Sequence, residues 1–189
     1  MMNKTPWHKC RKCGPGGKMT MIKIRKAGLD DVAGIIRVCS EGYRATYPGL
    51  LPYYHIEKII RNFYHEDRIK DEILNVSQAW NGWFVAVDEG LVVGAGVGGL
   101  ISQTAAELFA LYIDPQRKRE GIGSKLLEAI TCDQVARGAA VQWVSVIDGN
   151  LMAVPFYESH GFRYQGEQPA YGLPENEGFE SLRYKRIIP

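Results

Sequence analysis

One segment near the middle of the chain constrains the fold more than any other. Residues 105–114, AAELFALYID, form an apolar run with the length and residue types of a strand, and a helix-like pattern begins at residue 122. Between them the basic stretch QRKRE leads directly into Gly121 and Gly123. Both glycines disfavour a helix. Their place at a helix start therefore needs another reason, and the pattern predicts a strand–loop–helix unit built around them.

The N-terminus of a helix supplies that reason. Its first backbone N–H groups have no partner within the helix and carry a partial positive charge. Glycines let an anion approach those amides closely and can adopt positive φ. We therefore predict a main-chain nest for a phosphate group, surrounded by the charges of Arg117, Lys118 and Arg119. The letters fit neither a Walker loop nor a dinucleotide fingerprint, whose last glycine is replaced by Leu126.

The hydrophobic pattern of residues 21–189 predicts one mixed α/β domain. Strands are expected at 21–27, 83–90, 91–101, 105–114, 141–147, 162–165 and 180–187. Helices are expected over 32–43, 53–64, 122–130 and within 149–161. Residues 1–20 are polar, with Gly and Pro, and we expect them to form a disordered extension ahead of this domain.

Composition and charge exclude several classes of protein. The formal net charge of +2 does not indicate nucleic-acid binding. No apolar run approaches the roughly 20 residues of a membrane span, and the N-terminus lacks a signal segment, so we expect a cytoplasmic location and no membrane partner. Cys10, Cys13 and His8 offer three ligands where a structural zinc site needs four, so no metal is expected. A zinc-dependent interaction module stays open for that segment.

Two blocks of the chain together resemble the GNAT superfamily of N-acetyltransferases. They are LYIDPQRKREGIGSKLL and VIDGNLMAVPFYESHGF. The family has a [QR]-x-x-G-x-[GA] loop after its fourth strand and an N-x-x-A-x-x-F-Y-E-x-x-G-F helix after its fifth. Lys118 departs from this pattern, because Gln or Arg is usual there. The resemblance covers residues 20–188 and implies a central mixed, mostly antiparallel twisted sheet of about seven strands, flanked by about four helices. It also implies acetyl-CoA as acyl donor; homodimers are frequent among relatives, but no stretch here identifies an interface.

The resemblance also assigns residues to the acetyl-CoA site. The main chain of Leu111, Tyr112 and Ile113 corresponds to the strand segment that pairs with the pantetheine arm. The pyrophosphate loop corresponds to Lys118, Arg119, Glu120, Gly121, Ile122, Gly123 and Ser124. Asn150 matches a residue whose side-chain amide hydrogen-bonds the cofactor arm; it could equally cap a helix, or do both.

Two side chains are candidates for the chemistry. Tyr157 matches the family's general acid, because amine attack on a thioester expels a thiolate that a nearby phenol can protonate. Glu107 stands where some members place a catalytic glutamate that could act as the base, although a strand-end surface carboxylate is an equal interpretation. Tyr43 and Tyr47 fall in the helical region that usually lines the acceptor pocket. Neither motif holds a cysteine, which argues against a covalent acetyl-enzyme.

The sequence thus predicts an acyltransferase that moves acetyl from acetyl-CoA to the primary amine of a small molecule, by direct attack in a ternary complex. Two alternatives stay open: a protein lysine or N-terminus as acceptor, and a non-catalytic acetyl-CoA-binding module. Ser145 replaces a glutamate found in some members that acetylate protein N-termini, which disfavours that acceptor. Tyr157 and Asn150 disfavour the non-catalytic module.

Overall fold

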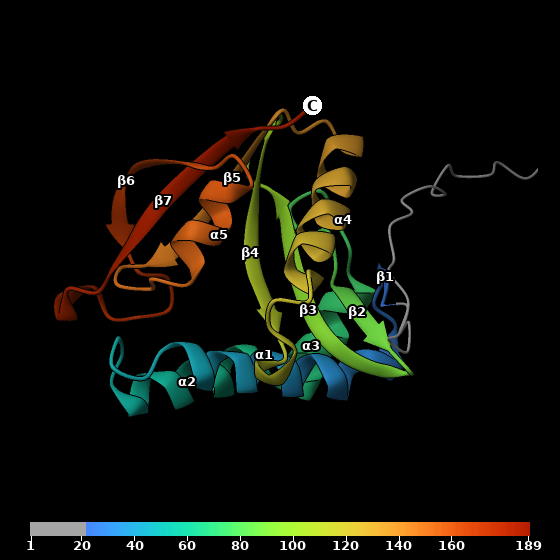
Figure 1. Ribbon diagram of the computed structural model, residues 1–189, viewed down its shortest axis with the longest axis horizontal. Coiled ribbons are helices and arrows are strands. Elements are labelled where there is room, and N and C mark those ends of the chain that lie inside the picture. Colours follow the sequence, from blue (N-terminus) through green and yellow to red (C-terminus); the bar gives the residue numbers. More distant parts are fainter. Residues whose placement is uncertain (1–21) are drawn as a thin grey trace, which may run out of the picture.

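A seven-stranded sheet organises residues 22–189, the part of the chain that this computed structural model describes (Figure 1). The strands are β1 (Lys23–Lys26), β2 (Phe84–Asp88), β3 (Leu91–Leu100), β4 (Ala105–Ile113), β5 (Val141–Ile147), β6 (Arg163–Pro169) and β7 (Glu180–Ile187). Their order in space is β1-β2-β3-β4-β5-β7-β6, and every neighbouring pair is antiparallel except β4 and β5. The predicted mixed, mostly antiparallel sheet is confirmed. The extension expected at residues 1–20, including Cys10 and Cys13, lies outside the described residues.

In the described part of the chain, five α-helices cover the sheet, one more than the sequence pattern predicts. They are α1 (Val32–Thr46), α2 (Tyr53–Phe63), α3 (Glu66–Leu74), α4 (Ile122–Ala136) and α5 (Ala153–Ser159). The additional helix is α3, in which only Ile69 is buried, so its hydrophobic stripe is too thin to read in the sequence. Between residues 22 and 189, no helix combines the length and the apolar character that crossing a membrane requires.

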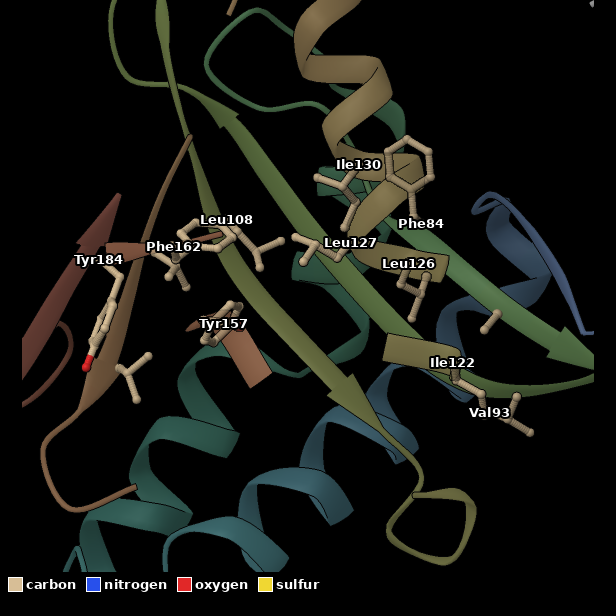
Figure 2. Close-up of a cluster of buried hydrophobic side chains, with 13 residues drawn as sticks. Phe84, Val93, Leu108, Ile122, Leu126, Leu127, Ile130, Tyr157, Phe162 and Tyr184 are labelled. Carbon is tan, nitrogen blue, oxygen red and sulfur yellow. The ribbon is translucent and has the colours of Figure 1, made fainter. Parts of the chain in front are cut away.

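Helices lie on both faces of the sheet. On one face, α1 and α3 pack over β2 and β3, with Ile35, Val38 and Ile69 fully buried. On the other face, α4 packs through Ile122, Leu126, Leu127 and Ile130 against side chains of β2, β3 and β4 (Figure 2). Burial of each such side chain contributes about 1.5–3 kcal/mol to folding. This packing fixes the start of α4 at the end of β4.

Two glycines of β3 bring α4 close to the sheet. A Cβ atom at Gly94 would lie 2.9 Å from Leu126 Cδ1, and one at Gly96 would lie 2.9 Å from Ile130 Cδ1. Because alternate residues of a strand face the same side, the two glycines form one row beneath the helix. Larger residues there would push α4, and with it the glycine loop, away from β4.

The sheet opens between β4 and β5. The two strands pair in parallel only from Ala105 to Leu108 and from Val141 to Val144. Beyond these residues β4 continues beside β3 as far as Ile113, whereas β5 continues beside β7 (Figure 1). The edge of β4 that faces β5 therefore has no strand partner over its last five residues. This unpaired edge borders the candidate functional site.

Candidate functional site

The start of α4 presents unpaired amides. Gly121, the residue before the helix, has φ +75° in the left-handed region, and Lys125 N donates back to its carbonyl oxygen over 3.2 Å. Within residues 22–189, the amides of Ile122, Gly123 and Ser124 have no hydrogen-bond acceptor. Three N–H groups at the positive end of a helix form an anion site. The predicted phosphate nest thus has the required backbone geometry.

The two glycines of the loop play different parts. Gly121 needs its positive φ, and a Cβ atom there would meet nothing within 4 Å. Gly123 lies inside the first turn of α4, where a Cβ atom would be 3.4 Å from the ring of Phe156. The sequence allowed positive φ at both glycines, but only Gly121 adopts it. Gly123 is helical and faces α5.

The basic run divides into one neutralised cation and two free ones. Arg117 Nη2 lies 2.9 Å from Asp88 Oδ2 and 2.7 Å from Glu120 Oε2. The guanidinium of Arg117 is thus paired with two carboxylates, and its hydrogen bond to Glu120 lowers the pKa of that carboxyl group. Lys118 and Arg119 are exposed and make no ion pair within the described chain. The charge around the nest therefore comes from Lys118 and Arg119, whereas Arg117 braces the loop against β2.

His160, which the sequence did not single out, links the end of α5 to the start of α4 through a hydrogen bond with Ser124. His160 Nε2 lies 2.9 Å from Ser124 Oγ, and His160 Nδ1 lies 2.7 Å from the carbonyl oxygen of Phe156. The hydroxyl of Ser124 is therefore engaged by a side chain, while its amide remains free. No spacing rule links residues 36 positions apart.

The side chain of Asn150 uses its oxygen to accept a hydrogen bond within the described part of the chain and leaves its NH2 group free there. Its side-chain Oδ1 accepts a hydrogen bond from the amide of Ala153 over 3.2 Å, in the turn that leads into α5. The residue is buried, and its Nδ2 group has no acceptor among residues 22–189. Asn150 therefore closes the turn before α5, whereas the N-cap residue of the helix is Met152, which makes no side-chain cap hydrogen bond; the side-chain NH2 group of Asn150 is left as an unpaired donor in the described chain.

The last residues of β4 use their side chains for packing. Leu111 and Ile113 pack toward α4, and Tyr112 packs on the opposite face against Tyr43 of α1 and Tyr64, which follows α2. Only the main chain of these three residues is available on the edge that faces β5. This arrangement fits the main-chain role expected of them.

A cavity of about 480 Å³ lies on the α1–α3 side of β4. Nine aromatic side chains line it: Tyr43, Tyr47, Phe63, Tyr64, Trp80, Trp83, Phe109, Tyr112 and Tyr171. Burial raises the pKa of Tyr43, Tyr47 and Tyr112, so these phenols stay neutral. The charged residues of the lining are Arg68, Glu72 and Glu107. The predicted residues Tyr43, Tyr47 and Glu107 thus meet at one cavity.

Glu107 is not the exposed strand-end carboxylate that was one interpretation of the sequence. Its side chain is 16% exposed, and Arg183 of β7 forms an ion pair with its Oε1 atom. Ser145 Oγ donates to the same oxygen over 3.1 Å and accepts from Arg183 Nη1 over 2.7 Å. The guanidinium of Arg183 also lies 4.8 Å from the ring centroid of Trp143. These contacts fix Glu107 while leaving Oε2 without a partner among residues 22–189.

Tyr157 of α5 is buried in the hydrophobic cluster between α4, α5 and the sheet. It is 8% exposed and packs edge-to-face on Phe162, with ring centroids 5.4 Å apart (Figure 2). It also packs edge-to-face on Phe156, with centroids 5.1 Å apart. It does not line the described cavity, but burial and the proximity of Tyr47 raise the pKa of its phenol. The phenol therefore remains protonated at neutral pH, as a proton donor must.

Comparisons with known proteins agree with this geometry. The model of the acetyltransferase (GNAT) domain matches residues 79–164. The uncharacterized N-acetyltransferase YuaI of Bacillus subtilis is 30% identical over 145 residues, which cover 74% of this chain and 79% of that protein. A spermidine N(1)-acetyltransferase of Thermoplasma acidophilum is 27% identical, over 76% of this chain and 89% of the relative. The structure of PaiA N-acetyltransferase from T. acidophilum, in complex with coenzyme A, superposes with a TM-score of 0.74 at 24% identity, covering 88% and 99% of the two chains.

Proposed function

Because the chain belongs to the GNAT superfamily of N-acetyltransferases, we propose that it transfers acetyl from acetyl-CoA to the primary amine of a small molecule. The observation that carries this proposal is the double role of β4. Its unpaired edge leads to the free amides at the start of α4, and residues of the same strand line the aromatic cavity. A donor held along that edge and an acceptor held in the cavity would meet beside one strand.

The donor side of the site fits coenzyme A in residue type and in main-chain geometry. The main chain of Leu111–Ile113 would pair with the pantetheine arm, and the amides of Ile122–Ser124 would bind the diphosphate. Lys118 and Arg119 add positive charge, and Asn150 Nδ2 supplies a further donor. When bound, acetyl-CoA supplies an activated acetyl thioester. The solved neighbour in complex with coenzyme A supports this choice of donor.

Glu107 is the proposed base. The ammonium form of an amine first loses its extra proton to solvent, and the neutral amine then needs a base as it attacks; Glu107 offers an unpartnered carboxylate oxygen at the cavity for this second step. Arg183 and Ser145 hold the other oxygen, so the free one has a fixed direction. As the new N–C bond forms, Glu107 takes the proton that the nitrogen loses.

Tyr157 is the proposed acid. It donates a proton to the sulfur that leaves when the C–S bond breaks. Burial raises the pKa of the phenol, which keeps it protonated until the thiolate leaves. Glu107 and Tyr157 thus balance the reaction, with one proton accepted and one donated.

The cavity supports a small acceptor. Its volume of about 480 Å³ lies within the range of small-molecule sites. The relative named as a spermidine acetyltransferase makes polyamines one of the first classes to test.

An acceptor screen scored by release of the coenzyme A thiol tests the function. It would include polyamines, amino acids, aminoglycosides and peptides with a free lysine or N-terminus. We expect saturable release with at least one class of small amine and an acetylated product by mass spectrometry. Release with peptides alone would replace the small acceptor by a protein. Binding of acetyl-CoA with no release from any amine would indicate a non-catalytic module.

A further inference from the structure

An arginine on α3 stands at the cavity in a fixed orientation. The guanidinium carbon of Arg68 lies 4.6 Å from the ring centroid of Phe63, and its Nε atom lies 2.7 Å from Glu72 Oε1. Glu72 is itself held, because Trp83 Nε1 donates to its Oε2 atom over 2.8 Å. All four residues line the cavity. The stacking and the ion pair together set the plane of the guanidinium.

The outer edge of this guanidinium has no partner. Within residues 22–189, neither terminal nitrogen of Arg68 makes a hydrogen bond or an ion pair, and the side chain is 36% exposed. A guanidinium with its Nε engaged and both Nη groups free offers a planar pair of donors. That pair matches the two oxygens of a carboxylate.

The charges at the cavity balance. Arg68 opposes Glu72, and Arg183 opposes Glu107 from behind the wall. The buried phenols stay neutral, so a polycation finds no excess of negative charge. An acceptor that carries one ammonium group and one carboxylate would instead meet a free oxygen of Glu107 and the free edge of Arg68. The aromatic walls would contact its apolar part.

We propose that Arg68 is a specificity-determining residue that binds a carboxylate of the acceptor, so that the acceptor is an amino acid or a similar amine bearing a carboxylate. This inference rests on the proposed function, since it concerns the acceptor cavity of the same site. A purely structural i,i+4 pair between Arg68 and Glu72 would stabilise α3 but would not discriminate among acceptors.

Matched pairs of acceptors test the proposal. L-Phenylalanine is compared with 2-phenylethylamine, and 6-aminohexanoate with hexylamine, in wild type, Arg68→Gln and Arg61→Gln. Arg61 lies on α2, is exposed and does not line the cavity, so its variant controls for loss of one positive charge. In wild type we expect kcat/KM to favour the carboxylate member of at least one pair about tenfold or more. Arg68→Gln should remove this preference through KM, whereas Arg61→Gln should retain it.

The variant Arg68→Lys keeps the charge opposite Glu72 and lacks the planar fork. It should fold as wild type does and lose part of the preference, which separates recognition from folding should Arg68→Gln be unstable. Equal or better acetylation of the amines without a carboxylate, polyamines included, would overturn the proposal. Equal losses by Arg68→Gln with both members of a pair would also overturn it.

Direct binding separates this inference from the proposed function. If no amine is acetylated, the proposed function fails, and binding of L-phenylalanine and 6-aminohexanoate is measured by calorimetry. Binding to wild type that is lost in Arg68→Gln and kept in Arg61→Gln would still support the carboxylate site. No binding of either compound to wild type would overturn it.

Discussion

The proposed donor half and the proposed acceptor half of this site use different chemical groups. Apart from Asn150, the donor half is one stretch, from the end of β4 through the glycine loop to the first turn of α4, and it offers mainly backbone groups. The acceptor half is assembled from side chains of all three N-terminal helices and of the strands from β3 to β7. Backbone recognition leaves a local pattern of glycines in the sequence. Side-chain recognition depends on residues that meet only in the folded chain.

The largest effect is expected at the junction of the two halves. Tyr157→Phe should lower kcat roughly 100-fold or more, because the acid is lost, and should leave the Kd for acetyl-CoA nearly unchanged. Thiol-release kinetics and calorimetry measure the two quantities. Since burial raises the pKa of Tyr157, its ionisation should cause no loss of wild-type activity up to about pH 10. Parallel losses in turnover and affinity would show that the residue belongs to the donor half instead.

A second variant tests whether amine turnover can be lost while acetyl-CoA binding is kept. Arg183→Leu leaves Glu107 without its ion pair, and both side chains are only 16% exposed. We expect the free energy of unfolding to fall by roughly 3 kcal/mol and amine turnover to fall at least tenfold. The double variant Glu107→Gln/Arg183→Leu should recover stability without activity. Affinity for acetyl-CoA should stay within about twofold of wild type; a larger loss would mean that the halves are coupled.

A glycine pair tests the donor half in isolation. Gly121 and Gly178 both have positive φ and open space around the position of a Cβ atom, but Gly178 lies between β6 and β7, which contribute nothing to the donor half. Alanine at either position should cost about 1 kcal/mol of stability. Only Gly121→Ala should also weaken acetyl-CoA binding, by several-fold, because strain in the loop displaces the amides. Similar affinities for the two variants would argue against the nest.

The smallest effect concerns the contact between Glu177 and α2, the helix whose residues Ile59 and Phe63 line the cavity. Glu177, between β6 and β7, has its Oε2 atom 2.6 Å from His55 Nε2 and 2.9 Å from Tyr54 Oη on α2. The hydrogen bond from His55 is the main cause that lowers the pKa of Glu177 below its usual 4.5. Its stabilising contribution is therefore complete above pH 4.5 and is lost as the pH falls through the lowered value.

Thermal unfolding of wild type and Glu177→Gln measures this contribution. We expect the Tm of the variant to be lower at pH 7 and the difference to shrink as the pH falls below 4.5. A difference that is constant from pH 7 to pH 3.5 would contradict the ionic contribution of Glu177.

The contrast also explains what the sequence could and could not predict. The left-handed Gly121 before α4 and the hydrogen bond from Ala153 N to Asn150 Oδ1 before α5 both follow from local chemistry, and the structure has both. Arg117 was expected near phosphate but pairs with Asp88, which is 29 positions away in the chain. The contact between Arg183 and Glu107 spans 76 positions, so no periodicity could reveal it. Helix α3, which carries Arg68, buries too little apolar surface to be recognised from its letters.

A crystal structure of the acetyl-CoA complex tests the central claim most directly. We expect the diphosphate on the amides of Ile122–Ser124, the pantetheine arm along the unpaired edge of β4, and the thioester sulfur within hydrogen-bonding reach of Tyr157 Oη. A diphosphate bound away from the start of α4, or a thioester directed away from both Tyr157 and the aromatic cavity, would contradict the account.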